Sequence, residues 1–292
     1  MIVTSPTCSA SRWTRVTQSP TGLFFLGILF IGVPFVLANA VSKLFMVAPE
    51  LKDFRNPLKT AVLIAAYCCF VLWVERRSVF EFSFKGSVKE LSAGFAWSSA
   101  LVGAVVAILG LLGCFQVTGW SSGYGMLQML QLHLFVAVLE ELLFRGVLFR
   151  LLENIVGTWV ALVLSTLLFG LAHLGNPGAN WITLGCLGVL SVSLTLAYLV
   201  TRRLWMCIGM HWAWNFVQGG IFSLPVSGTQ VWPGVLATET YGADWLTGGA
   251  FGIEASVLTL LFLTALSGFF LRVAQQRQHW KSWRPRALPR LS

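Results

Sequence analysis

The sequence predicts an all-α, polytopic membrane protein, and three observations support this fold class. Apolar residues make up 56% of the 292-residue chain and charged residues only 11%, against about 25% charged residues in soluble proteins. The mean hydropathy is +0.76. Apolar segments long enough to cross a bilayer recur along the whole chain. Because so few charges could not cover a globule in water, we expect lipid to be the solvent for much of the surface.

We predict about eight transmembrane helices around a central polar cavity. A helix needs about 20 apolar residues to cross the hydrocarbon core, and it satisfies its own backbone polar groups there. The second span is the shortest. We expect the loop 223–253, which has no Lys or Arg, on the outer side, where it can dip back into the protein. The predicted spans are 22–47, 58–74, 94–118, 127–149, 155–174, 181–200, 204–222 and 254–271.

The distribution of positive charge predicts the orientation of these spans. Sixteen of the twenty Lys and Arg residues fall on one side, which the positive-inside rule assigns to the cytoplasm. Both termini are therefore predicted to be cytoplasmic, in a multi-pass protein of the cell membrane. We divide the chain into a cytoplasmic tail (1–21), a single transmembrane domain (22–271, motif core 127–220) and a basic cytoplasmic tail (272–292).

The net charge of +9 suggests the membrane surface as a partner. We expect the basic tail to contact anionic lipids or to be solvated, and we expect no binding of nucleic acid. Arg12 and Arg15, followed by an apolar run ending in Ala38-Asn39-Ala40, also imitate a cleavable signal peptide. We favour a retained first span, as is usual in polytopic proteins.

The fourth span contains charged residues where lipid makes them costly, so they are candidates for function. Glu141 and Arg145 are four residues apart on one helical face, with the acid first, as in a stable ion pair. Glu140 is rotated from that face by about 100°, so it is free to act as a general base. The equally weighted alternative is a structural Glu–Arg lock in which Glu140 is a second acceptor.

Two further spans contribute polar residues. His211 and Asn215 share a face of the seventh span, from which they could donate hydrogen bonds to the oxyanion of a tetrahedral intermediate. The alternative is interhelical hydrogen bonding between packed spans. His173 in the fifth span favours a role in oxyanion binding, because polar residues inside three different helices indicate one shared interior site.

A metal is the alternative to chemistry based on side chains alone. His173, His211 and Glu140 would supply the His₂Glu ligand set of a catalytic zinc. However, the sequence has no HExxH motif, and Asn215 is a poor zinc ligand although a good oxyanion donor. We therefore favour no metal cofactor and keep zinc as the alternative.

Three motifs carry a resemblance to a known family. EELLFRG (140–146), FGLAH (169–173) and HWAWN (211–215), in this order on successive spans, resemble the signature motifs of the CAAX-protease and bacteriocin-processing (CPBP, or Abi) family. This family includes the type II CAAX prenyl proteases. The resemblance is strong over 127–220, and the stretch WLTGGAFGIEAS (245–256) is similar to one frequent in bacterial members.

The resemblance implies an intramembrane endopeptidase that acts on a membrane-associated protein or peptide. Glu140 would activate the attacking water, His173 would position it, and His211 and Asn215 would stabilise the oxyanion. Glu141 and Arg145 would support the site. Two alternatives stay open: a non-catalytic adaptor or bacteriocin-immunity protein that binds a partner in the same cavity, and a proton-coupled transporter.

Three residues are harder to place. His173 falls near the outer end of a straight fifth span, whereas Glu140 and His211 lie deeper. His133, seven residues before Glu140 on the same face, is expected to form hydrogen bonds near the interface. We expect Glu254, at the head of the last span, to be an acidic residue favoured by the helix dipole rather than a catalytic group.

Overall fold

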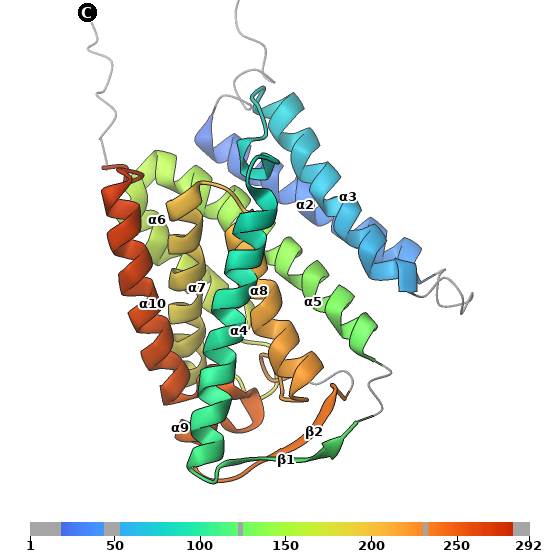
Figure 1. Cartoon of the computed structure of the whole chain (residues 1–292). Helices are drawn as coiled ribbons and strands as arrows, with labels where there is room; N and C mark the ends of the chain where they lie inside the picture. Colours follow the sequence, from blue (N-terminus) through green and yellow to red (C-terminus); the bar gives the residue numbers. More distant parts are fainter. Residues whose placement is uncertain (1–18, 44–52, 122–124, 230–232, 283–292) are drawn as a thin grey trace, which may run out of the picture.

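The computed structural model describes residues 19–43, 53–121, 125–229 and 233–282, and it confirms an all-α fold (Figure 1). The main helices are α2 (Pro20–Ser42), α3 (Arg55–Cys69), α4 (Ser87–Leu111), α5 (Met126–Glu141), α6 (Arg150–Ala172), α7 (Trp181–Thr201), α8 (Trp205–Phe216) and α10 (Val257–Gln276). The π-helical turns η3 (Phe70–Val74), η5 (Leu142–Phe149) and η6 (Val217–Ile221) extend α3, α5 and α8. The short elements are the helices η4 (Phe80–Phe82), α9 (Asp244–Thr247), η7 (Gly249–Phe251) and η8 (Ile253–Ala255), and the strands β1 (Phe115–Trp120) and β2 (Leu236–Thr240).

Every predicted span overlaps a helix within the described residues. Six helical stretches there are long and apolar enough to cross a membrane. One of them, Met126–Ala172, contains two of the predicted spans, and the seventh predicted span, Trp205–Ile221, is helical but shorter. The second span is longer than predicted and runs from Arg55 to Val74. The third is wrong at its end, because the helix stops at Leu111.

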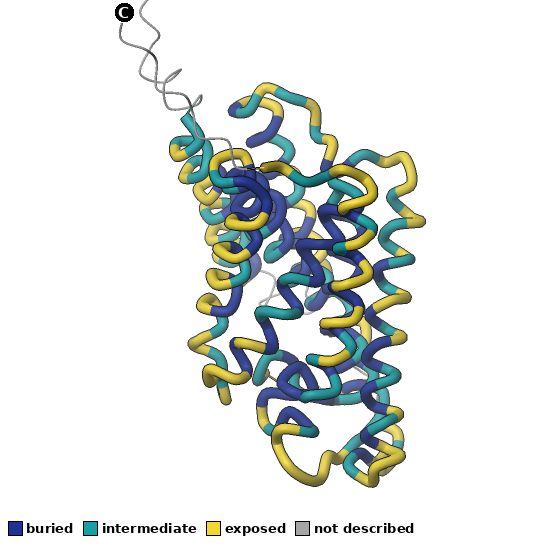
Figure 2. The backbone as a smooth tube through the Cα atoms, turned by 90° about the vertical axis from the view of Figure 1, so that its left-hand side faces the viewer, coloured by how far each residue is buried: buried dark blue, intermediate teal, exposed yellow. Residues whose placement is uncertain are grey.

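The outer faces of the helices are apolar, as expected for contact with lipid. Phe25 in α2, Val163 and Leu167 in α6 and Phe269 in α10 are at least half exposed. Figure 2 shows exposed positions following the outer sides of helices whose inner sides are buried. In water such an apolar surface would promote aggregation, whereas in a bilayer the lipid chains solvate it. The protein is therefore an integral membrane protein.

Helices α4 and α8 are in direct backbone contact. A Cβ atom at Gly94 would lie 2.2 Å from the carbonyl oxygen of Met206, and one at Gly209 would lie 2.2 Å from that of Leu91. Membrane helices approach this closely only where small residues face each other. These two glycines therefore fix the position of α8, which carries His211.

The predicted fourth and fifth spans form a helical hairpin that turns at Gly157. This residue has φ 79° and ψ 169°, a conformation that favours glycine. The hydropathy pattern predicts the turn between Arg150 and Ile155, but the helix continues through these residues. The two legs of the hairpin are the helical stretches before and after Gly157. Residues that are equally many positions from Gly157 on the two legs therefore lie opposite each other.

Part of the predicted outer loop forms a β-strand. Strand β2 pairs antiparallel with β1, with Phe115 opposite Thr240 and an irregularity between Val117 and Gly119. Figure 1 shows this ribbon at the opposite end of the molecule from the C-terminal end of α10. The ribbon joins the end of α4 to the segment that follows α8, so the loop is held against the helices.

The first part of the basic tail packs on the protein. Arg277 Nη1 donates to the carbonyl of Val200 (2.9 Å), and His279 Nδ1 donates to that of Leu199 (2.8 Å). Lys281 N donates to the hydroxyl of Thr158 at the start of the second leg of the hairpin. The predicted lipid contacts of residues 283–292 and the N-terminal tail up to residue 18 lie outside the described residues.

Candidate active site

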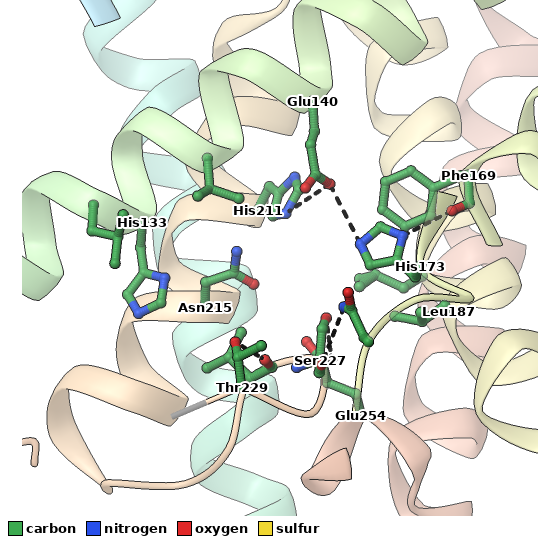
Figure 3. A pocket seen from close by; sticks show the side chains of 15 residues that line it. His133, Glu140, Phe169, His173, Leu187, His211, Asn215, Ser227, Thr229 and Glu254 are labelled. Atoms are coloured by element: carbon green, nitrogen blue, oxygen red, sulfur yellow. Dashed lines mark hydrogen bonds and ion pairs between the residues drawn. The ribbon is translucent and has the colours of Figure 1, made fainter. Parts of the chain in front are cut away.

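All four residues predicted to be catalytic line one cavity of about 150 Å³ (Figure 3). Glu140 comes from α5, His173 from the end of α6, and His211 and Asn215 from α8. Leu187 and Leu190 of α7 add an apolar wall. The cavity is more than large enough to hold a water molecule. The structure thus brings together side chains that lie up to 75 residues apart in the sequence.

Glu141 and Arg145 form the ion pair expected from their spacing. Arg145 Nη1 lies 2.8 Å from Glu141 Oε1, and both side chains are fully buried. Arg145 also donates to the carbonyl and hydroxyl of Ser191 (3.0 Å each) and to Thr195 Oγ1 (3.3 Å). A buried ion pair is tolerated when its remaining hydrogen-bonding capacity is used. These bonds tie η5, the continuation of α5, to α7.

Glu141 also orients His211. The ring Nδ1 of His211 lies 2.8 Å from Glu141 Oε1. A carboxylate can only accept, so Nδ1 carries a proton and Nε2 faces the cavity. The next residue, Trp212, donates through Nε1 to the carbonyl of Leu130 in α5 (3.0 Å). Two hydrogen bonds therefore fix α8 against α5, the helix that carries both glutamates.

Glu140 points into the cavity. Its Oε2 lies 3.8 Å from Nε2 of His211 and 3.9 Å from Nε2 of His173. The side chain of Glu140 is 20% exposed, and its Oε2 has no hydrogen-bond partner among the described residues. Both separations are too long for a direct hydrogen bond. Two imidazoles and a carboxylate thus surround one small space.

The hairpin at Gly157 explains why His173 meets Glu140. The rings of Phe144 and Phe169 are in edge contact with centroids 5.0 Å apart, so these residues face each other across the hairpin. One helical turn farther from Gly157 on each leg lie Glu140 and His173. The mismatch in depth that a straight fifth span implies is therefore wrong, because the chain turns later than the hydropathy pattern predicts.

His173 ends α6, and its ring is held by its own helix. Nδ1 lies 2.8 Å from the carbonyl oxygen of Phe169. Because this oxygen accepts only, Nδ1 carries the proton and Nε2 faces Glu140. The ring of Phe169 also stacks obliquely on that of His173, with centroids 4.8 Å apart. Both histidines therefore present Nε2 to the same carboxylate.

Asn215 and His133 line the remaining part of the α5–α8 side. Asn215 lies one turn from His211 on the same face, is 5% exposed and borders the cavity. His133 is buried and also borders the cavity, where its Nε2 has no hydrogen-bond partner among the described residues. Its position one helical repeat before Glu140 already indicated the shared face.

The far wall of the cavity contains residues that the sequence did not identify. Asn176, Ser227 and Thr229 line it together with Glu254. Glu254 is 2% exposed and lies in η8, before the membrane helix α10. Its expected role as a helix-terminal acid is therefore wrong. Burial raises the pKa of the Glu254 carboxyl, and donors from Ser227 and Trp214 act in the opposite direction.

The three ligands of the alternative zinc site surround one cavity, but the distances between their ligand atoms are longer than in a zinc site. Around a tetrahedral zinc with bonds of about 2.0–2.2 Å, ligand atoms lie roughly 3.3 Å apart. The observed separations from Glu140 to the two histidines are 3.8 and 3.9 Å. Among the described residues, no three His, Cys, Asp or Glu side chains are arranged closely enough to hold a metal ion. Zinc binding would thus require a small contraction of the site.

Comparison with known proteins identifies the segment that carries this site. Residues 120–217 match the family model described as type II CAAX prenyl endopeptidase Rce1-like. No curated protein and no solved structure matches the chain. The matched segment contains Glu140, Glu141, Arg145, His173, His211 and Asn215. It excludes Ser227, Thr229 and Glu254. The match supports, over this segment, the family indicated by the three motifs.

Proposed function

We propose that this chain, whose residues 120–217 match the type II CAAX prenyl endopeptidase family model, hydrolyses a peptide bond of a membrane-associated protein by water that Glu140 activates. The observation that carries the proposal is the position of Glu140 Oε2, which faces Nε2 of both His211 (3.8 Å) and His173 (3.9 Å) inside a cavity. These separations allow one water molecule to hydrogen-bond to the carboxylate and an imidazole together.

The chemistry follows from the groups present. Glu140 removes a proton from the water held beside His173, and the water oxygen bonds to the carbonyl carbon of the peptide. The carbonyl oxygen becomes an oxyanion, to which Asn215 Nδ2 and His211 donate. Glu140 then returns its proton to the peptide nitrogen, and the C–N bond breaks. The products are a carboxylic acid and an amine.

The orientation of His211 constrains its protonation state. Nδ1 already donates to Glu141, so Nε2 can donate to an oxyanion only when the ring is an imidazolium. The carboxylates of Glu140 and Glu141 both lie beside this ring, and together they balance the charges of His211 and Arg145. The active form therefore combines an ionised Glu140 with a protonated His211.

The decisive experiment compares the purified protein with Glu140→Ala in liposomes. The probes are a farnesylated, internally quenched peptide ending in a CAAX tetrapeptide and the same peptide without the farnesyl group. We expect Glu140→Ala to lose about 10³-fold or more in kcat/KM. Glu239→Gln, which changes an exposed acid on β2, should retain full activity.

Natural substrates can be sought by proteomics of membrane-anchored proteins in cells that carry the wild type or Glu140→Ala.

Activity retained in Glu140→Ala would overturn the assignment of Glu140. A cellular phenotype that survives both Glu140→Gln and His173→Ala would instead support the adaptor or immunity alternative. The metal question is tested separately. We propose a reaction without metal, so chelation should leave activity unchanged, whereas stoichiometric zinc with activity lost on chelation and restored by zinc would establish the alternative.

A further inference from the structure

Glu254 is a buried acid in the far wall of the cavity, and the proposed reaction gives it no role. It is 2% exposed and lies outside the segment matched by the family model. A buried carboxylate is costly unless hydrogen bonds compensate it. The hydrogen-bond donors to Glu254 therefore indicate the role of this carboxylate.

Both oxygens of Glu254 accept hydrogen bonds, and the donors belong to two different elements. Oε1 accepts from Trp214 Nε1 at 2.8 Å. Oε2 accepts from the backbone N–H of Ser227 and from its hydroxyl, each at 2.7 Å. Such charge-assisted bonds are stronger than neutral ones. Trp214 lies on α8 between His211 and Asn215, so the carboxylate connects Ser227 directly to the catalytic helix.

Ser227 is at the tip of a tight turn. The backbones of Val226 and Thr229 exchange two hydrogen bonds of 2.8 and 2.9 Å. Ser227 and Gly228 between them have φ values of 47° and 76°, the pattern of a type I′ turn. The turn cannot supply an acceptor for the N–H at its own tip, and Glu254 provides it.

The same turn is packed against the end of the helical hairpin. Asn176, three residues after His173, donates through Nδ2 to the carbonyl of Ser227 (2.9 Å). A Cβ atom at Gly228 would lie 2.0 Å from the carbonyl oxygen of Pro177. These contacts therefore fix the position of the turn, which faces Glu140 across the cavity (Figure 3).

We propose that Glu254 is a positioning residue, which clamps the 226–229 turn to Trp214 so that a polar wall of Ser227 and Thr229 holds the substrate peptide against Glu140. This inference rests on the proposed function. The peptide lies between the histidines and this wall. The hydroxyls of Ser227 and Thr229 donate to Glu254 and to the carbonyl of Val226, so their oxygens remain free to accept from N–H groups of the peptide backbone. The wall belongs to the chain outside the matched domain, so substrate alignment depends on residues beyond the three motifs.

The clamp requires a carboxylate, because an amide has only one acceptor oxygen. In Glu254→Gln, either the Ser227 donors or the Trp214 N–H would face an NH₂ group. If Trp214 is also changed to Phe, its donor disappears, and the Gln oxygen can serve Ser227 alone. The proposal thus predicts that Trp214→Phe partly rescues Glu254→Gln.

Hydrogen–deuterium exchange on the full chain in liposomes tests the clamp without any substrate. We expect the amides of 226–229 to exchange about tenfold faster or more in Glu254→Gln, as for the loss of a hydrogen bond to a charged group. Exchange in α4 and in Glu239→Gln should not change. In the Trp214→Phe background, the added effect of Glu254→Gln on these amides should be much smaller.

Unchanged exchange at 226–229 in Glu254→Gln, or the same added effect in both backgrounds, would overturn the clamp. Hydrolysis of the farnesylated probe then tests positioning. We expect Glu254→Gln to lower kcat/KM by about tenfold or more, with partial recovery in the double variant. If exchange rises while kcat/KM is unchanged, the positioning role is wrong. If the wild type cleaves no probe, the proposed function fails, and exchange alone decides the clamp.

Discussion

Substituting Gly209 with alanine tests whether the contact between α4 and α8 sets the geometry of the site. A Cβ atom at this position would lie 2.2 Å from the carbonyl oxygen of Leu91, whereas carbon and oxygen in close contact are about 3.3 Å apart. The two backbones must therefore separate by about 1 Å. His211 lies two residues farther along α8, which also packs on α5, so a shift of the helix changes the distance between His211 and Glu140.

A displacement of about 1 Å in a catalytic group can cost on the order of 10²-fold in rate, and overpacking at such a contact costs about 1–3 kcal/mol in stability. We expect both effects in Gly209→Ala, measured as kcat/KM for the quenched peptide and as the melting temperature in detergent. Gly103→Ala is the matched control, because a Cβ atom at this position in α4 would meet no neighbouring atom of the described residues within 4 Å. If Gly209→Ala keeps wild-type kcat/KM, the contact does not position His211, and the reasoning is refuted.

Three further outcomes are expected. Asn215→Ala should lower kcat by about 10²–10³-fold, as for the loss of one oxyanion donor, with KM nearly unchanged; a change confined to KM would contradict this role. Glu140→Gln should abolish activity at every pH, because an amide cannot act as the general base; activity that survives in this variant would exclude the base. Gly157→Ala should destabilise the protein by about 1–2 kcal/mol, since its φ of 79° strains other residues, and by shifting one leg of the hairpin it should also reduce hydrolysis; unchanged melting and activity would show that the turn does not set the spacing between Glu140 and His173.

The sequence alone determined the fold class, because hydropathy and helix length are local properties. The extra length of the helix beyond Arg150 was not visible, because Arg150, Glu153 and Asn154 interrupt the apolar pattern although the helix continues through them, and the turn depends on one glycine conformation. The end of the third span was misplaced for a related reason. Residues 115–118 are apolar enough to continue a helix, but they pair with a strand more than one hundred residues away.

The sequence predicted those contacts of the candidate site that lie within a single helix. The four-residue spacing placed Glu141 beside Arg145 and His211 beside Asn215 without any knowledge of the fold. The hydrogen bond from His211 to Glu141 could not be derived in this way, because it joins two helices whose separation depends on packing.

The clamp at Glu254 shows what only the tertiary structure decided. In the sequence, this glutamate stands at the start of an apolar helix, where a favourable helix dipole is sufficient explanation. The stretch that contains it, 245–256, resembled one found in bacterial relatives, but a pattern does not identify hydrogen-bond partners. Trp214 and Ser227 become its donors only when the loop folds back over the cavity. Hydropathy and helical periodicity act within a span, whereas the site depends on contacts between spans and loops, and these form only when the whole chain packs.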